Sequence, residues 1–509
     1  MRIAALDLGS NSFHLLVADV HADGTIAPIV RDKEMLRLGE VVAKHGHIPP
    51  AEMDRAVATV RRFRLLAESA GANELHACAT SATRIAANGD ELVDRIEDEA
   101  GVHVKVISGL DEAHLIFTAI RSSVVLDPPP ALAIDIGGGS VEFMLGDSTG
   151  LLWAESLRIG VGMLTNHFVH TDPLSKTERR RMRDHIVHEL EPVIEATTRY
   201  SPGIAIGSSG TIEALARLAL TTADEPVPTS VNQMRVDREA LRSVHRTLLQ
   251  SDADQRRKIP GMDPKRIDLI VAGSVLLNTV MDALGLDSIV ISEWALREGI
   301  VLDAASHHDP DEWSDDPHAI RRASVLSLAR RCNVGELHSR HVMRLANELF
   351  DQTRELHGLD DTDRELLEYA ALLHQVGHHV SSDGHPKHAA YIIRHGALRG
   401  FSPEEVRILA GIARWQRRGS PEPDDEIVGP LDQTDFERMR KLVALLRIAD
   451  GLDRGRRQDV AHIDVSVGPD LVLIRLIHET GHVELDLWGA RRKRALFEKL
   501  FDRVVEFRE

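Results

Sequence analysis

Over roughly the first 300 residues, short apolar runs with the composition of strands alternate with longer segments of helical period. The N-terminal part begins with three apolar runs joined by tight turns, which predict a three-stranded meander. Strands and helices then alternate, and such alternation predicts an α/β domain over residues 1–124. The predicted strands are 3–8, 13–20, 26–38, 74–79 and 102–107, and the predicted helices are 49–70, 80–99 (from a Thr/Ser cap) and 111–121.

The same pattern restarts near residue 125, which predicts a second α/β domain over 125–305. It again opens with three apolar runs separated by turns, so the two halves look related. Its predicted strands are 131–136, 141–146, 151–159, 204–207 and 288–291, and its predicted helices are 162–198, 208–220, 263–283 and 292–305.

After residue 305 the pattern changes twice. Residues 306–317 are acidic and interrupted by proline, which is typical of a linker. Residues 318–457 have helical periodicity, apart from a proline-rich loop at 419–432, and predict an all-α domain. The final segment, 458–509, predicts a small α/β domain with strands at 463–467, 471–477 and 483–487 and a closing helix from 490. A chain of 509 residues is long enough for several domains of this size.

The same short sequence motif occurs at the start of both α/β halves. A strand ends on an Asp, a Gly/Ser turn follows, and a second strand returns. Glycine lets the turn backbone approach a ligand closely, and consecutive N–H groups form an anion-binding concavity. Two copies favour a duplicated phosphate clamp, in which the Asp faces a metal ion or water because two anions repel. The two clamps consist of Asp7, Gly9, Ser10, Asn11 and Ser12, and of Asp135, Gly137, Gly138, Gly139 and Ser140.

Three further features are candidates for chemistry. Glu112 lies in the first turn of a helix, where acids are common for electrostatic reasons, and on this evidence alone an ordinary helix-start acid is the better interpretation. Its place just ahead of the second clamp strengthens the alternative, in which it orients a water for attack on phosphorus. Arg84 could pair with a phosphoryl group, although an isolated helical Arg is more often solvated. The strand-to-helix turn Ser208, Ser209, Gly210 and Thr211 presents amides as a third anion site or is a plain connection. Segments 261–266 and 293–299 are expected mainly to cap and pack helices.

The composition of the chain excludes several classes of protein. A formal net charge of −18 argues against nucleic-acid binding, and any phosphate site must rely on local positive charge, backbone N–H groups or a bound cation. The two cysteines, Cys78 and Cys332, give no disulfide framework. No signal peptide and no apolar stretch long enough to cross a bilayer is visible. We therefore expect a cytoplasmic protein.

In the helical region, His338, His374 and Asp450 are spread as metal ligands are in phosphohydrolases of the HD type. That motif needs an Asp directly after its second His, and Gln375 stands there. An amide is a poor substitute for a carboxylate on a divalent metal. We therefore expect this region to be non-catalytic, with Gln375 preventing a two-metal centre.

These motifs stand in the order and spacing of a known family. The segments 7–14, 80–84, 107–113, 134–142 and 207–211 resemble those of the exopolyphosphatase/guanosine pentaphosphate phosphatase family in its long form. The resemblance implies a duplicated actin-like (ribonuclease-H-type) fold, an HD-like helical domain that commonly lacks metal ligands, and a small C-terminal α/β domain. The cleft between the first two domains would hold the end of a polyphosphate chain.

The resemblance also implies roles for individual residues. Glu112 falls on the catalytic Glu, proposed as the base for water, and Arg84 on the phosphate-contacting Arg. Asp135, Gly137 and Glu142 fall on the second clamp, with the acids, and Asp7 in the first clamp, acting through Mg²⁺ and water. Asp111 replaces the family's usual Glu before the catalytic one.

The leading interpretation is an exopolyphosphatase, a phosphoanhydride hydrolase that releases orthophosphate from inorganic polyphosphate. Removal of the 5′-phosphate from guanosine pentaphosphate uses the same chemistry and is the first alternative. An actin-like kinase or nucleotide switch is the alternative of another class. We also expect a homodimer and a groove for polyphosphate lined by arginines of the helical region, namely Arg414, Arg417, Arg418, Arg447, Arg454, Arg456 and Arg457.

Overall fold

The structure is a computed structural model that describes residues 1–21, 26–222, 227–306, 317–334, 336–478 and 483–509. The chain forms two compact units, Met1–Ile320 and Arg321–Glu509, and each is described by itself. Most of the predicted linker, residues 307–316 with Trp313, lies outside the described residues.

The first unit begins with a five-stranded sheet of order β3-β2-β1-β4-β5. The first three strands are antiparallel neighbours, whereas β4 and β5 run parallel to β1. The strands are β1 (Arg2–Leu8), β2 (Ser12–Val20), β3 (Ile26–Met35), β4 (Glu74–Ala79) and β5 (Val104–Val106). The helices are α1 (Leu38–His45), α2 (Pro50–Ser69), α3 (Ser81–Ile85), α4 (Gly89–Arg95), the π-helical turn η1 (Ile96–Ala100) and α5 (Gly109–Arg121).

A second sheet repeats this topology with one strand added at the edge, in the order β10-β11-β9-β6-β7-β8. Its meander is antiparallel, and β9 and β11 continue parallel to β6. The strands are β6 (Ala131–Ile136), β7 (Val141–Asp147), β8 (Gly150–Leu157), β9 (Ile204–Ser208), β10 (Arg235–Asp237) and β11 (Ser288–Ile291). The helices are α6 (Val161–Phe168), α7 (Lys176–Glu189), α8 (Glu191–Tyr200), α9 (Ser209–Thr222), α10 (Arg238–Gln250), α11 (Ala253–Arg256), α12 (Ile270–Ala283) and α13 (Leu296–Ser306).

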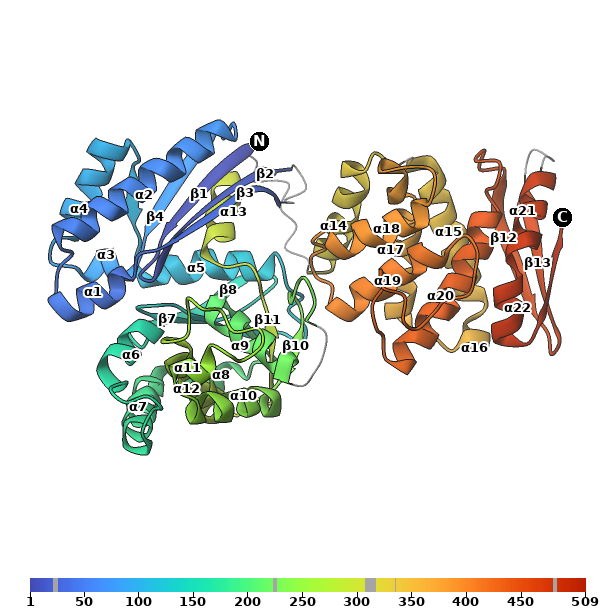
Figure 1. Cartoon of the computed structure of the whole chain (residues 1–509). Helices are drawn as coiled ribbons and strands as arrows, with labels where there is room; N and C mark the ends of the chain where they lie inside the picture. Colours follow the sequence, from blue (N-terminus) through green and yellow to red (C-terminus); the bar gives the residue numbers. More distant parts are fainter. Residues whose placement is uncertain (22–25, 223–226, 307–316, 335, 479–482) are drawn as a thin grey trace. The chain divides into compact units, whose positions relative to one another are not determined.

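The two sheets belong to one packed body. Helix α13 is the last helix of the second half, yet it packs on β1 and β2 of the first sheet and beside α5 (Figure 1). One apolar core therefore contains residues of both halves, among them Ile3, Ala133 and Val301. The repeated sheet topology confirms the predicted duplicated α/β fold class.

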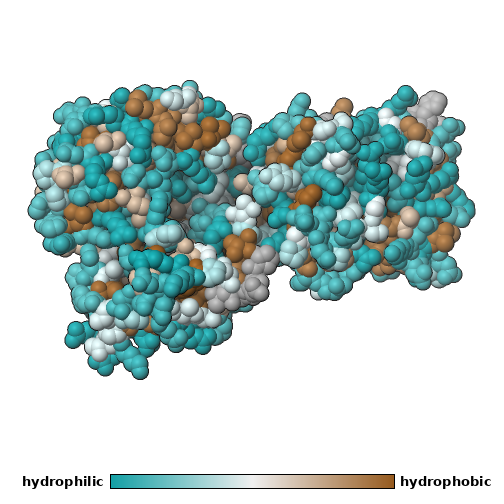
Figure 2. Space-filling model, in the orientation of Figure 1, coloured by the Kyte–Doolittle hydropathy of each residue, from teal (hydrophilic) through white to brown (hydrophobic). Residues whose placement is uncertain are grey.

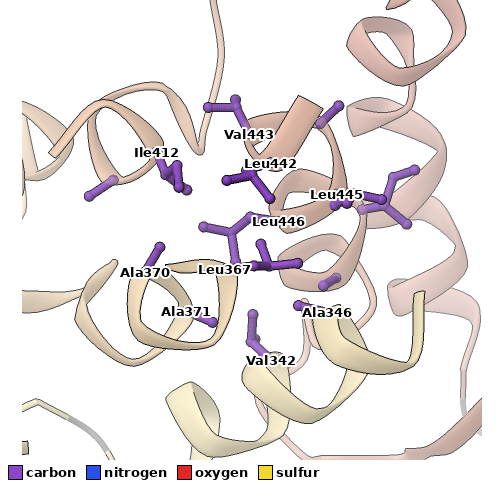
Figure 3. Close-up of a cluster of buried hydrophobic side chains, with 14 of the residues drawn as sticks. Val342, Ala346, Leu367, Ala370, Ala371, Ile412, Leu442, Val443, Leu445 and Leu446 are labelled. Carbon is purple, nitrogen blue, oxygen red and sulfur yellow. The ribbon is translucent and has the colours of Figure 1, made fainter. Parts of the chain in front are cut away.

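The second unit is mainly helical and ends in a three-stranded sheet of order β12-β13-β14. Helices and sheet share one apolar core, part of which Figure 3 shows. The helices are α14 (Pro317–Arg331), α15 (Glu336–Gln352), α16 (Arg354–His357), α17 (Asp361–Leu373), the 3-10 turn η2 (Val376–His379), α18 (His385–His395), α19 (Pro403–Trp415), α20 (Gln433–Gly451), α21 (Glu484–Lys493) and α22 (Ala495–Phe501), and the strands are β12 (Val460–Val467), β13 (Leu471–His478) and β14 (Val504–Arg508).

Several predicted elements were wrong. The expected helix 80–99 is interrupted between α3 and α4, and the Thr80 side chain makes no capping hydrogen bond. Residues 483–487, predicted as a strand, begin helix α21, and the third strand of the sheet is β14 instead. Helices α1 and α10 were missed; α1 packs against α3 and α6, and α10, whose amphipathic pattern was overlooked, packs against α9 and α12.

Two of the arginines assigned to a polyphosphate groove are used inside the second unit. Arg447 is buried and donates to the carbonyl oxygens of Trp415 and Gly419. Arg414 lies 3.2 Å from Asp425 and over the ring of Trp415. These two side chains therefore hold the loop that follows α19, and their charges are used by these contacts rather than left for a polyanion, contrary to the prediction.

The face shown in Figure 2 is mostly hydrophilic, with hydrophobic residues scattered among polar ones. Among the described residues, no helix is both long enough and apolar enough to span a membrane.

Candidate active site

A cleft of about 540 Å³ lies in the first unit, lined by residues of both sheets. Both predicted clamps and the third small-residue turn reach it, so segments far apart in the sequence meet at one place. The predicted residues that line it are Asp7, Gly9, Ser10, Asn11, Ser12, Glu112, Asp135, Gly137, Gly138, Gly139, Ser140, Ser209, Gly210 and Thr211.

The two aspartates occupy equivalent positions in the repeated sheets. Asp7 lies near the end of β1 opposite His14, and Asp135 lies near the end of β6 opposite Glu142. Asp135 also faces Ser208 of the parallel strand β9 and accepts a short hydrogen bond from its hydroxyl. Ser208 is fully buried and does not itself line the cleft, so its role is to orient Asp135.

Glu112 reaches the cleft from the first turn of α5. Ser108 caps this helix: its hydroxyl accepts from the N–H of Asp111, and the Asp111 carboxylate accepts from the N–H of Ser108. Glu112 is only 8% exposed, and its Oε2 makes no hydrogen bond. The nearest cation is Arg84, whose Nη1 lies 3.5 Å from that oxygen. Arg84 also donates to the carbonyl oxygen of Ile107 and does not line the cleft.

Burial and mutual repulsion raise the pKa of the acids gathered here. Burial raises the pKa of Asp7 to about 7, although Arg297 opposes the rise. Burial raises the pKa of Asp135 to about 6, and the hydrogen bond from Ser208 limits the rise. Burial and the charge of Asp135 raise the pKa of Glu142 to about 7. The pKa of Glu112 lies well above its usual range because of burial and the nearby Glu142.

Glu142 lies behind the cleft. It is 1% exposed and accepts a 2.8 Å hydrogen bond from the hydroxyl of Ser156 on β8. It does not line the cavity, so the structure places it where it acts on Asp135 and Glu112 through its charge.

The glycines of the second clamp let the two clamps approach each other. A Cβ at Gly138 would lie 3.0 Å from the Cβ of Asn11 and 3.2 Å from its backbone nitrogen. A Cβ at Gly139 would lie 2.7 Å from the hydroxyl of Ser81 and 2.9 Å from that of Ser10. Any larger residue would therefore push the clamps apart.

The third turn begins α9 with Ser209 at a φ of 88°, a conformation that is strained for a residue with a side chain. A Cβ at Gly210 would lie 2.1 Å from the guanidinium of Arg266, so this cation lies directly over the turn. Backbone amides at a helix N-terminus and an adjacent guanidinium together suit an anion.

Cations that the sequence analysis did not single out complete the cleft. Arg31, Lys33, Arg266 and Arg297 all line it. Burial and the nearby guanidinium of Arg266 lower the pKa of Lys33 to about 8. These side chains supply the local positive charge that an acidic protein needs in order to hold a polyanion.

His14 links one of these cations to the first clamp. Its Nδ1 lies 3.2 Å from Nη1 of Arg297, and its Nε2 lies 2.7 Å from the hydroxyl oxygen of Ser12. Burial and Arg297 hold the pKa of His14 well below its usual value, so the ring is neutral. Because a guanidinium can only donate, Nδ1 accepts and Nε2–H donates to Ser12. The Ser12 hydroxyl proton is then available for an oxyanion in the cleft.

The donor set of the cleft suits a divalent cation with oxygen ligands. Asp7 and Asp135 line the cavity together with Glu112, and burial raises the pKa of both aspartates. Carboxylate oxygens are the ligands that Mg²⁺ prefers in proteins.

Residues 16–308 match the model of the Ppx/GppA phosphatase family, and residues 320–486 match the model of domain III of Ppx/GppA phosphatases. The chain belongs to the Ppx/GppA phosphatase family. This result confirms the resemblance proposed from the motifs and the prediction of a phosphatase. The HD-like character of the helical domain stays a prediction.

Curated relatives agree with this assignment. The chain is 34% identical over 331 residues to exopolyphosphatase 1 of Mycobacterium tuberculosis, covering 65% of this chain and 94% of the relative. It is 34% identical over 306 residues to exopolyphosphatase 1 of Mycobacterium leprae, covering 59% and 89%.

Solved structures share the fold of about 60% of the chain. An exopolyphosphatase from Cytophaga hutchinsonii is 32% identical, with a TM-score of 0.56, and the match covers 60% of this chain and 98% of that one. The Ppx/GppA family member from Aquifex aeolicus is 25% identical, with a TM-score of 0.53, covering 61% and 99%.

The cationic side chains of the cleft were not recognised from the sequence, for reasons that differ between them. Arg266 and Arg297 lie in segments that were expected mainly to cap and pack helices, and Glu298 does cap the start of α13. Lys33 lies in a strand with charges of both signs, where nothing distinguishes it. The only feature of the sequence that could have indicated a place in the cleft is that both arginines lie close to glycine-containing segments of the second half.

Proposed function

We propose that this protein is an exopolyphosphatase that hydrolyses the terminal phosphoanhydride of inorganic polyphosphate and uses Mg²⁺. One observation carries the proposal: a buried carboxylate oxygen without a hydrogen bond, on Glu112, in a cleft shared with two glycine clamps and several cations. The names of the curated relatives support the choice of substrate.

In the reaction, a water oxygen attacks the terminal phosphorus while the bond from that phosphorus to the bridging oxygen breaks. Glu112 accepts the proton of the water, and the leaving group is the chain shortened by one phosphate. Burial raises the basicity of Glu112, which suits it for this transfer once it is ionised. Arg84 holds the carboxylate in place from the side away from the cleft.

The remaining cleft residues bind and polarise the terminal phosphoryl group. The amides of the two clamps, the third turn and the Ser12 hydroxyl donate hydrogen bonds to its oxygens. Arg266 and Arg297 balance the charge that those oxygens carry. Asp7 and Asp135 would hold Mg²⁺, with Glu142 behind them, and bound Mg²⁺ would neutralise negative charge on the phosphates.

The test of this assignment is Glu112→Gln, which keeps the size of the side chain and removes the base. We expect kcat for phosphate release to fall by about 10²–10⁴-fold. The matched control is Glu213→Gln: Glu213 also lines the cleft but pairs with Arg217. The control should keep its kcat. Near-normal turnover by a folded Glu112→Gln protein would remove Glu112 from the mechanism.

The lining of the cleft favours polyphosphate over guanosine pentaphosphate. Among the described residues that line it there is no Phe, Tyr or Trp, so a nucleoside base finds no aromatic surface for stacking. We expect kcat/KM for long polyphosphate to exceed that for the nucleotide by about tenfold or more, the equivalent of about 1.4 kcal/mol. Side-by-side kinetics on the purified chain measure this ratio, and a preference for the nucleotide would reverse the substrate assignment.

A further inference from the structure

In the second unit, three helices bring three metal-binding side chains together. His338 lies in the first turn of α15, His374 lies at the end of α17, and Asp450 lies near the end of α20. One ligand atom from each residue lies within 4.8 Å of the others. The cluster is separate from the cleft of the first unit and is not used in the proposed hydrolysis.

The spacing of these atoms matches a coordination sphere. Nε2 of His338 lies 3.4 Å from Oδ1 of Asp450, and Nε2 of His374 lies 3.5 Å from the same oxygen. Tetrahedral bonds of about 2.0–2.1 Å place two ligands about 3.3–3.4 Å apart. Both Nε2 atoms are buried and make no hydrogen bond. Buried polar atoms without partners are rare, and a bound ion would satisfy both.

Neighbouring groups orient each ligand. Nδ1 of His338 lies 2.7 Å from Oδ2 of Asp453, and Nδ1 of His374 lies 2.6 Å from the carbonyl oxygen of Ala371. Each ring therefore carries its proton on Nδ1 and points an unprotonated Nε2 towards the other ligands. The second oxygen of Asp450 is held by the ammonium group of Lys493, which leaves Oδ1 facing the histidines.

The three ligands are attached to a rigid apolar core. Figure 3 shows Val342 and Ala346 of α15, Ala370 and Ala371 of α17, and Leu442 and Leu446 of α20 packed together. His338 precedes Val342 by one helical turn, and Asp450 follows Leu446 by one turn. Close packing at the ends of three helices fixes where the ligands lie before any ion binds.

We propose that His338, His374 and Asp450 bind one transition-metal ion of the zinc type, and that the ion takes an oxyanion as its fourth ligand. Two imidazoles and one carboxylate suit Zn²⁺ and similar ions better than Mg²⁺. The amide oxygen of Gln375 accepts a hydrogen bond from Arg456 at 3.3 Å, and an amide is a poor ligand for a divalent metal beside two imidazoles and a carboxylate. The site thus holds one ion, and the two-metal centre that the sequence analysis excluded is not required.

The fourth position would open into a cavity of about 580 Å³ with a cationic lining. His338 and Asp450 line this cavity. Arg417, Arg418 and Arg454 make no ion pair with another described residue, and their charge is therefore available to a ligand. Such a lining selects an anion, and a phosphate group fits both the metal and the guanidinium groups. The cationic residues of the lining are Arg417, Arg418, Arg454, Arg456, Arg492 and Lys493.

The metal is tested on the full chain, stripped with a chelator and titrated with Co²⁺ in excess Mg²⁺. We expect about one equivalent of Co²⁺ with the visible absorption of a four-coordinate site, displaced by Zn²⁺ and not by Mg²⁺. Excess Mg²⁺ keeps the oxygen ligands of the cleft occupied, so a failure here does not bear on the proposed hydrolysis. A wild-type chain that takes up no Co²⁺ under these conditions would overturn the proposal.

Single-residue variants test which side chains bind the ion. His374→Asn and His338→Gln should each abolish the absorption, whereas His379→Asn should retain it. His379 is exposed in the adjoining turn and contributes no atom to the cluster, so it is the matched control. Thermal unfolding establishes which variants are folded. Full binding by any folded His338 or His374 variant would show that the ion lies elsewhere and would overturn the site.

The oxyanion is tested by adding inorganic phosphate to the Co²⁺ form. We expect the absorption spectrum to change in a saturable way, and Arg417→Gln to weaken the apparent affinity for phosphate by about tenfold. Arg457→Gln makes the same change of charge outside the cavity lining and should leave the affinity unchanged. A spectrum that phosphate does not alter would remove the fourth ligand from the proposal.

Discussion

At the scale of single residues, the carboxylates of the cleft have raised pKa values chiefly because they are buried. Asp7 is the clearest case, because burial raises its pKa to about 7 while Arg297 is the main group that opposes the rise. The same arginine contacts His14, so one guanidinium supports both the acid and the hydroxyl of the first clamp. The chemistry of the cleft therefore depends on a cation that lies far from the clamp in sequence.

Arg297→Gln should make this dependence measurable. Without the guanidinium the Asp7 carboxylate loses its principal stabilising charge, so its pKa rises further. If activity needs ionised Asp7, the acidic limb of the pH profile of kcat/KM should move to higher pH by about one unit. Arg61→Gln, on the exposed face of α2, is the control and should leave the profile unmoved. An unshifted limb in the Arg297 variant would show that Asp7 does not control the acidic limb.

At the scale of elements, α5 is the helix that carries Glu112, the proposed base. Its capping box, made by Ser108 and Asp111, determines where the first turn begins and thus where Glu112 points. The same type of cap occurs at the start of α7, where Ser175 and Glu178 form it on a helix that carries no residue of the cleft. Comparing the two caps separates the effect of a cap on the stability of the protein from its effect on the position of Glu112.

Ser108→Ala and Ser175→Ala should each lower the free energy of unfolding by about 1 kcal/mol, since each removes one capping hydrogen bond. Only Ser108→Ala should also lower kcat, because only α5 positions Glu112. Thermal unfolding and phosphate release measured on both variants decide the point. Equal kcat values in the two variants would mean that the cap has no part in placing the base.

At the scale of the whole molecule, the buried acids link stability to pH and to cation binding. The pKa values of Asp7, Asp135 and Glu142 are about 6 to 7 in the folded state and about 4 in the unfolded state. Between about pH 4 and pH 7, these three acids therefore bind more protons in the folded state than in the unfolded state. The contribution of these three acids to the free energy of unfolding should therefore fall as pH rises from about 4 to about 7, whereas histidines with lowered pKa values, such as His14 and His245, contribute in the opposite direction.

Mg²⁺ should compensate for this loss if it binds those carboxylates. We expect Mg²⁺ to raise the Tm by several degrees at about pH 8 and much less at about pH 5, where protons hold the same oxygens. An Asp7→Asn/Asp135→Asn variant should lose the contribution of these acids to the pH dependence of the Tm and should respond more weakly to Mg²⁺. A response to Mg²⁺ that is independent of pH in the wild-type chain would place the cation away from these acids.

Local features of the sequence were enough to predict the two clamps, the helix that carries Glu112 and the duplicated α/β class. A glycine turn between two apolar strands and a capped helix start depend on residues close together in the chain, so the sequence carries their signal directly. The pairing of Asp135 with Glu142 also follows from the hairpin itself.

The tertiary structure alone decided which distant side chains meet. Arg266, which precedes α12, lies over the start of α9, and Arg297 reaches the cleft because α13 packs against β1 and β2 of the other half; nothing near either arginine in the sequence indicates these contacts. Residues 483–487 have the pattern of a strand, yet packing against α20 makes them the start of a helix. The sequence pattern singled out His338, His374 and Asp450 as a possible ligand set, but only the packing of three helices shows that their ligand atoms meet. Contacts between distant segments depend on the shape and volume of a shared core, which no local pattern encodes.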